Sequence, residues 1–213
     1  MMCRIGVMLM LFLAGQAVAG MVQFPVDDFE HGLGPEWQVK SFKGDTDYRV
    51  VPEGTGHVLQ ADSHGTASAL IHKVDLDPRD YPILSWRWKV AGTIAQGDER
   101  TRAGDDYAAR VYVIFPHWFF PKTRTLNYLW ANHLRQGEFI ANAYTGNAMM
   151  IAVESGPEHS GQWIVERRNI IEDYRRAFGG DPPQIGAIAI MTDTDNTGVT
   201  ATAWYDDFAF VKR

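Results

Sequence analysis

Hydrophobic and polar residues alternate along most of this chain in short runs, with turn-forming residues between them. In residues 84–90, Leu84, Trp86 and Trp88 share one face of the run, and Ser85 and Arg87 lie on the other. This period of two predicts a half-buried strand. With this one included, strands are expected at 37–42, 48–51, 57–61, 67–74, 83–90, 107–115, 149–153, 185–191 and 200–211. Such spacing, without a βαβ rhythm, predicts an all-β fold, an antiparallel jelly-roll-like β-sandwich.

One helix interrupts the strands. Asn169 is a suitable N-cap with Glu172 three residues later, and Ile170, Tyr174 and Phe178 form an apolar stripe. Two glycines and two prolines follow and stop the element. The pattern predicts one short helix at 170–178.

Residues 1–19 have the pattern of an export signal. Arg4 supplies the positive start, residues 5–14 the apolar stretch, and small residues up to Ala19 the cleavage site before Gly20. The apolar stretch is too short for a membrane span, which takes about 20 residues. We therefore expect a signal peptide at 1–19 and a single β-sandwich domain at 20–213, periplasmic or secreted and without a membrane span.

Charge and cysteine content narrow the partners. The net charge is −6, and removal of the signal takes away Arg4 and no acid, which disfavours nucleic acid and anionic membranes. Cys3 is the single cysteine and leaves with the signal. Without cysteine, the metal that best suits this chain is one with oxygen ligands, such as calcium.

Acidic residues beside aromatics occur at both ends of the expected domain. In an extended strand, Asp28 and Glu30 project to the face opposite Phe29. Asp207, near the other end, lies next to Phe208. If the first and last strands meet, Asp28, Glu30 and Asp207 are candidate ligands for a structural Ca²⁺; the alternative is that they are solvated strand ends.

The loop 191–198 is the densest polar segment. Asp193, Asp195 and Gly198 match the start of an EF-hand, but the twelfth position is Trp204 instead of the bidentate Glu that calcium requires there. The EF-hand interpretation therefore fails. A loop of Asp, Asn and Thr suits a hydroxylated ligand or an ion equally, or a hydrogen-bonded turn.

A second acidic loop precedes the strand at 107–115, whose apolar residues on both faces indicate a central position. Arg110 lies within this strand and, if buried, needs an anionic partner. The candidate ligand-binding residues of this region are Asp105, Asp106, Arg110, Asp193, Asp195 and Asn196. They form either a structural ion-pair network or the floor of a ligand cleft.

Aromatic and amide side chains are the usual groups for binding sugars, since rings stack on sugar faces and amides bind hydroxyls. Trp130 and Asn142 are the candidates between 127 and 144. Motifs of the common enzyme classes are missing: Gly-x-Ser-x-Gly, His-Glu-x-x-His, a phosphate-binding glycine loop and a cysteine nucleophile after export.

Several ordered motifs together resemble domain-of-unknown-function family 3047 over about residues 24–210. They are DPRDYP at 77–82, SWRWKV at 85–90, AGDDYAAR at 103–110, NYLWAN at 127–132, VESG at 153–156, EDYRRAFG at 172–179 and AIMTDTDNT at 189–197. The resemblance implies an exported bacterial single-domain protein without established activity. The acids at both ends are also similar in layout to galactose-binding-like jelly rolls of carbohydrate-binding modules, in which a structural calcium joins the terminal strands.

Three functions follow as hypotheses. The first is a non-catalytic binding module for a glycan or similar polar small molecule. The second is a polysaccharide hydrolase or lyase in which Arg110, Tyr112 and Asp193 act on a sugar acid. The third is a structural protein of the cell envelope. The arrangement of Arg110 and the acidic loops, in an open cleft or in the core, separates them.

Overall fold

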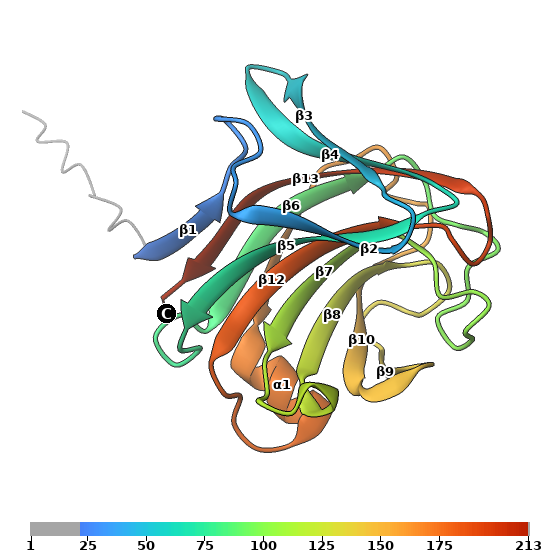
Figure 1. Ribbon diagram of the computed structural model, residues 1–213. Helices are drawn as coiled ribbons and strands as arrows, with labels where there is room; N and C mark the ends of the chain where they lie inside the picture. The colour runs from blue at the N-terminus through green and yellow to red at the C-terminus, as the bar shows by residue number, and fades with distance from the viewer. Residues whose placement is uncertain (1–21, 213) are drawn as a thin grey trace, which may run out of the picture.

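The computed structural model describes residues 22–212, so the signal segment 1–19, Cys3 and Gly20 lie outside the described residues. Over this range two β-sheets pack face to face, and a short helix lies at one end of them (Figure 1). The strands are β1 Gln23–Asp27, β2 Trp37–Lys43, β3 Asp47–Glu53, β4 Gly56–His64, β5 Ala67–Leu76, β6 Ile83–Val90, β7 Tyr107–Phe115, β8 Arg124–Ala131, β9 Phe139–Asn142, β10 Thr145–Ser155, β11 Ile164–Asn169, β12 Ile185–Asp193 and β13 Thr200–Val211; the helices are η1 Phe120–Lys122 and α1 Ile170–Phe178.

The strands form two sheets. In sheet I the strand order is β11-β6-β13-β4-β3, with β1 also paired to β13. In sheet II the order is β2-β5-β12-β7-β8-β10-β9.

The predicted all-β sandwich with one α-helix is confirmed for the described residues. Four strands, β1, β8, β9 and β11, do not follow from the alternation of the sequence. β8 is buried on both faces and β11 is an edge strand rich in charge, so neither shows a clear period of two. The pairing of β8 with β10 is parallel, whereas the sequence predicts an antiparallel fold throughout.

The main core lies between the sheets and is rich in aromatic rings. Trp86 and Trp88 of β6 are fully buried and contact rings of sheet II. The ring centroids of Trp86 and Tyr128 lie 5.3 Å apart, and those of Trp88 and Trp130 lie 5.8 Å apart. These are the residues that the alternation of β6 places on one face. Burial of a large apolar side chain contributes about 1.5–3 kcal/mol, so this ring cluster dominates the packing between the sheets.

The helix α1 closes one end of the sandwich. Asn169 caps it by accepting hydrogen bonds from the backbone N–H groups of Ile171 and Glu172. Tyr174 packs its ring 4.8 Å from that of Phe115, and the buried Asp173 accepts a hydrogen bond from the hydroxyl of Tyr128. In the described residues, no helix is long and apolar enough to cross a membrane.

The terminal strands β1 and β13 pair antiparallel, but the three acids expected to bind calcium there do not form one group: Asp28 and Asp207 line the same hollow, and Glu30 does not. β1 ends at Asp27, and Phe29 has φ 54° in a turn, so the alternation assumed for Asp28 and Glu30 does not apply. Glu30 accepts from the backbone N–H of His57, 3.1 Å away. Asp207 instead contacts the guanidinium of Arg87 at 2.9 Å. The sequence-based metal site of Asp28, Glu30 and Asp207 is therefore not assembled.

The outer face of sheet II, which points away from the sandwich core, positions the candidate site. On β7, Val111 and Val113 belong to the core between the sheets, so the alternate residues Arg110 and Tyr112 lie on the outer face. A second apolar cluster on this side includes Leu134 of the segment before β9 and Met150 of β10. The outer face of sheet II is consequently buried in part.

Candidate functional site: a cleft on the outer face of sheet II

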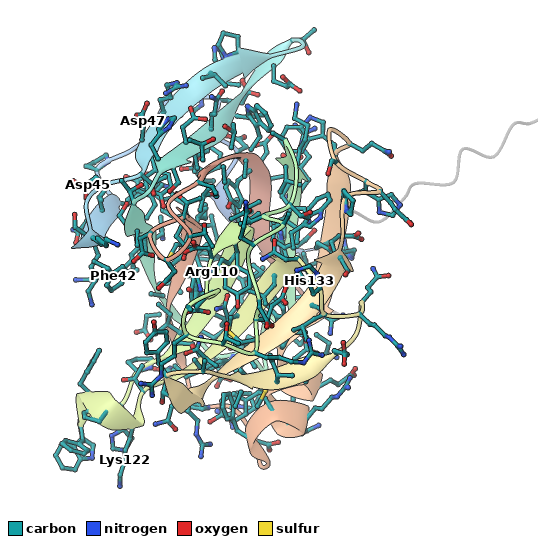
Figure 2. The ribbon with its side chains drawn as sticks, turned by 90° about the vertical axis from the view of Figure 1, so that its right-hand side faces the viewer. Phe42, Asp45, Asp47, Arg110, Lys122 and His133 are labelled. Atoms are coloured by element: carbon teal, nitrogen blue, oxygen red, sulfur yellow. The ribbon has the colours of Figure 1, made fainter. Side chains whose placement is uncertain are left out.

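A cleft of about 470 Å³ lies on the outer face of sheet II. Arg110 and Tyr112 of β7, Asn127 of β8 and the acidic loop after β12 line it. Two exposed aromatic side chains also line it: Phe42 of β2 is 60% exposed and Tyr144, between β9 and β10, is 53% exposed. In Figure 2 Arg110 lies near the middle of the molecule, and Phe42 lies toward its margin. The cleft thus combines a polar floor with aromatic side chains that reach solvent.

Arg110 is bound on several sides. Its Nε donates to Oδ1 of Asp193 at 2.9 Å, and its Nη2 donates to Oδ2 of the same carboxylate. Nη1 lies 3.8 Å from Asp105, and the rings of Tyr107 and Tyr112 lie 4.5 and 5.8 Å from the guanidinium carbon. The side chains of Arg110 and Asp193 are 5% and 1% exposed. This guanidinium is therefore already paired and does not offer a free fork to a ligand carboxylate.

Burial and charge act in opposite directions on the pair. Burial alone would lower the pKa of Arg110, but the carboxylate of Asp193 raises it well above its usual value, so the guanidinium stays charged. Burial raises the pKa of Asp193, the charge of Arg110 opposes this rise, and the nearby Asp106 and Asp105 add to it. The pKa of Asp195 is also raised, by burial and by Asp106. Because the carboxyl groups of Asp193 and Asp195 both have raised pKa values, a further positive charge close to them would stabilise their ionised forms.

Asp106 holds the loop after β12 against the start of β7. It is fully buried, and its Oδ1 accepts from the backbone N–H of Asn196 at 3.1 Å and from the Asn196 amide at 3.2 Å. Its Oδ2 accepts from the backbone N–H of Thr197 at 2.6 Å. These hydrogen bonds fix the position of Asp195, which precedes Asn196 in the loop.

Asp105 and Tyr144 are held by neighbouring loops. Asp105 accepts hydrogen bonds from the hydroxyl of Tyr107 at 3.0 Å and from the amide of Asn142 at 3.2 Å. The hydroxyl of Tyr144 donates to the backbone carbonyl of Arg102, and the Arg102 guanidinium lies 5.0 Å from the Tyr144 ring. The ring of Tyr144 is therefore positioned before any ligand binds.

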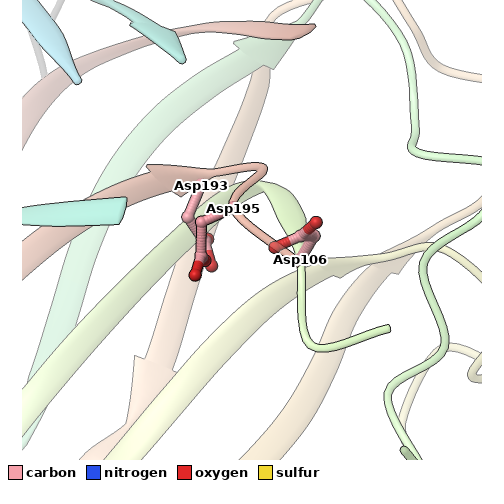
Figure 3. A group of neighbouring side chains, drawn as sticks. All are labelled: Asp106, Asp193 and Asp195. Atoms are coloured by element: carbon pink, nitrogen blue, oxygen red, sulfur yellow. The ribbon is translucent and has the colours of Figure 1, made fainter. Parts of the chain in front are cut away.

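Asp106, Asp193 and Asp195 form a group that could hold a metal ion, since one oxygen of each lies within 4.8 Å of the others (Figure 3). Calcium takes six to eight oxygen ligands. Here both oxygens of Asp193 bind Arg110, and those of Asp106 accept from Asn196 and Thr197, so few lone pairs remain. The donor set fits a weak cation site better than a closed structural one.

Most sequence-predicted site residues meet in this region. Asp105, Arg110, Asn142, Asp193, Asp195 and Asn196 line the cleft, and Asp106 supports it from behind. Trp130 does not: it is fully buried between the sheets, and its indole N–H donates to the carbonyl of Gly156. Trp130 lies on the side of β8 that faces the core. The polar residues beside it in the sequence do not reveal this orientation.

Asn127, Tyr144 and Phe42 line the cleft although the sequence analysis does not select them, and Phe42 comes from a separate part of the sequence. It lies at the end of β2, an edge strand whose residues after Trp37 are exposed. Lys40 of the same strand places its Nζ 5.4 Å from the Phe42 ring and 5.8 Å from the Phe120 ring. Nothing in one sequence separates such an exposed ring from a core phenylalanine.

A second hollow of about 400 Å³ continues from the cleft. It shares Ala148 with the cleft and is also lined by Phe120, Thr125 and Asn147. In Figure 2 the labelled Lys122 marks the projecting loop around η1, which supplies Phe120. The two hollows therefore lie next to each other on sheet II.

Comparison with known proteins gives a family and a fold. A family model described as "Protein of unknown function (DUF3047)" matches residues 35–209. Among curated proteins, nothing matches.

Among solved structures, the family 30 carbohydrate-binding module of a cellulosomal cellulase of Clostridium thermocellum is similar, with 9% identity and a TM-score of 0.50 over 83% of this chain and 91% of that one. A mutant of the CBM29-2 carbohydrate-binding module matches with 9% identity and a TM-score of 0.45 over 90% of this chain and 92% of the other. The cellulose induced protein Cip1 matches with 10% identity and a TM-score of 0.48 over 85% and 94%. At these identities the first match shows the β-sandwich fold alone.

Proposed function

We propose that this protein, which belongs to the DUF3047 family of proteins of unknown function, is a non-catalytic binding module for a glycan. The observation that carries the proposal is the cleft on sheet II, where the exposed rings of Phe42 and Tyr144 line the same hollow as Asp195, Asn196 and Asn142. Aromatic rings stack on the apolar faces of sugars, and carboxylate and amide groups bind their hydroxyls.

The two adjacent hollows support a ligand longer than one sugar. Phe120 and Asn147 add aromatic and polar lining beyond the cleft, next to Ala148. An oligosaccharide that occupied both hollows would contact the rings of Phe42, Tyr144 and Phe120. The fold is compatible, since the family 30 carbohydrate-binding module has the same sandwich.

The chemistry of the cleft favours binding over catalysis. Asp193 is tied to Arg110 by two hydrogen bonds, so neither is available as a general acid or base. Burial raises the pKa of Tyr112 to about 12, which makes its hydroxyl a poor base near neutral pH. A hydrolase or lyase built on Arg110, Tyr112 and Asp193 would need groups that this network already occupies.

A screen of immobilised glycans tests the proposal. The parent protein should bind at least one class of oligosaccharide, and Phe42→Ala and Tyr144→Ala should each lower the affinity about tenfold, which corresponds to ~1.4 kcal/mol. Trp118→Ala is the matched control, because Trp118 is 91% exposed and does not line the cleft. A blank screen, or equal losses in all three variants, would leave the cleft without a glycan-binding role.

Calcium is a second proposed occupant of the same acids. The group of Asp106, Asp193 and Asp195 supports it, because three carboxylate oxygens lie within 4.8 Å of one another. Asp195 would be the main ligand, since the oxygens of the other two already accept hydrogen bonds. We propose a weak site whose occupancy depends on the calcium concentration.

A further inference from the structure

The polar floor of the cleft has more carboxylates than cations that pair with them. Within residues 22–212, four carboxylates gather there, those of Asp105, Asp106, Asp193 and Asp195. The cations that face these carboxylates are Arg110, which is buried, and Lys43, whose side chain is 64% exposed, whereas Lys40 and Arg102 lie against the rings of Phe42 and Tyr144. This imbalance selects against a ligand with further negative charge.

Arg110 cannot reverse the imbalance by binding a sugar acid. Its Nε and Nη2 donate to Asp193, its Nη1 faces Asp105, and tyrosine rings lie against the guanidinium. The remaining N–H groups belong to a side chain that is 5% exposed, and a ligand carboxylate that reached them would lie beside Asp105 and Asp193, which repel it.

Asp195 is the acid with capacity left. Its Oδ1 accepts from the Asn196 amide at 3.3 Å, and its Oδ2 lies 3.9 Å from Nζ of Lys43, beyond hydrogen-bond length. It lines the cleft, and its side chain is 19% exposed. A ligand cation at this carboxylate would meet oxygens that still have free lone pairs.

Asn127 supplies an independent sign that the cleft takes a donor-bearing ligand. It lies in the lining and is 1% exposed, and its Oδ1 is buried without a hydrogen-bond partner. Its Nδ2 lies 3.1 Å from the sulfur of Met150, a weak acceptor. A buried acceptor without a partner costs about 1–3 kcal/mol, which an N–H or O–H of a ligand would recover.

We infer that the glycan bound in this cleft carries free amino groups, as in oligomers of glucosamine, and that Asp195 binds the protonated amine. The inference rests on the proposed function and names the class of its ligand. An ammonium group can donate hydrogen bonds to carboxylate oxygens that already accept one from another group. Calcium instead requires six to eight oxygen ligands. The sugar hydroxyls are then the donors available to Asn127, and Phe42 and Tyr144 contact the rings.

Calorimetric titration with two oligosaccharides tests the inference. The probes are β-1,4-linked glucosamine oligomers and N-acetylated oligomers of the same length, both at a pH at which the free amine is protonated. The glucosamine oligomer should bind at least tenfold more tightly. Asp195→Asn should remove the preference, so that the two oligomers bind with similar affinity, while Asp181→Asn, an exposed charge outside the cleft, should leave the preference intact.

Lys43→Ala provides a second variant on an exposed residue of an edge strand. It removes the cation that faces Asp195, so binding of the glucosamine oligomer should strengthen severalfold. Calcium should weaken binding of this oligomer, because both cations use the same acids.

Equal affinity for the two oligomers, no response to Asp195→Asn, or tighter binding in the presence of calcium would overturn the inference. In each of these cases a glycan still binds, and the proposed function survives. Absence of binding to every glycan in the screen is the separate outcome that removes the proposed function.

Discussion

Arg110 of β7 and Asp193 at the end of β12, 83 positions apart in the sequence, form a two-point ion pair on the outer face of sheet II. The pair is buried, so it serves the structure of the cleft rather than a ligand directly. It joins two neighbouring strands at the point where the loop carrying Asp195 begins. The sequence analysis leaves two roles open for these residues, and the geometry shows the first of them: a buried ion pair lies beneath the cleft on sheet II.

Replacement of Asp193 by Asn tests this structural role. The variant keeps the shape of the side chain but leaves the charge of Arg110 unpaired, so the free energy of unfolding should fall by about 3–5 kcal/mol. Denaturant unfolding measures the change. Asp195→Asn is the control, because the cation nearest to Asp195 is the exposed Lys43 at 3.9 Å, and this change should cost less than about 1 kcal/mol. Equal stability of Asp193→Asn and the parent would show that the pair is not needed.

The partly buried Glu166 of β11 should make the free energy of unfolding depend on pH. Its Oε1 is buried without a partner, and burial, with a further contribution from Glu154, raises its pKa to about 8. Below the ordinary pKa of about 4.3 the group is neutral in both the folded and the unfolded state. As the pH rises toward 8, the unfolded chain releases the proton while the folded chain keeps it, so stability is lost.

Melting curves of Glu166→Gln and the parent at pH 4 and pH 9 measure this effect. Gln stays neutral, so the variant should match the parent closely at pH 4 and melt several degrees higher at pH 9. Glu158→Gln, at an exposed position, should follow the parent at both values. A constant difference between Glu166→Gln and the parent would contradict the assigned pKa.

The proposed calcium site predicts stabilisation by mass action. At a tenfold excess of calcium over its dissociation constant, binding to the folded state alone contributes about 1.4 kcal/mol. For a chain of this length, that corresponds to a rise in Tm of about 3–6 °C relative to a sample with chelator. Asp195→Asn should lose the rise, whereas Asp28→Asn should retain it. Identical Tm values with calcium and with chelator would remove the proposed site.

The sequence predicts the fold well where one face of an element is buried and the other is not. Trp86 and Trp88 alternate with polar residues in β6, and Asn169 with the glycines after Phe178 defines α1. Trp130 is different, because β8 is covered on both faces and a period of two does not show which face its ring takes.

The cleft shows the same limit. The need of a buried arginine for an acidic partner is enough to predict from the sequence that Arg110 pairs with an acid. The same reasoning places Asp106 with the residues of the loop after β12, which its hydrogen bonds confirm. The terminal acids fail as a group because the positive φ of Phe29 ends the alternation that aligned Asp28 with Glu30. Phe42 is missed because the exposure of an edge strand depends on tertiary packing.

The central claim is that a glycan binds on the outer face of sheet II, and a crystal structure of the protein with the tightest-binding oligosaccharide tests it most directly. The account predicts sugar density in the cleft between Phe42 and Tyr144, with a donor group of the ligand at Asp195. Density on sheet I, beside Trp163 and Trp204, whose rings lie 5.0 and 4.6 Å from Nζ of Lys89, with an empty cleft on sheet II, would contradict it.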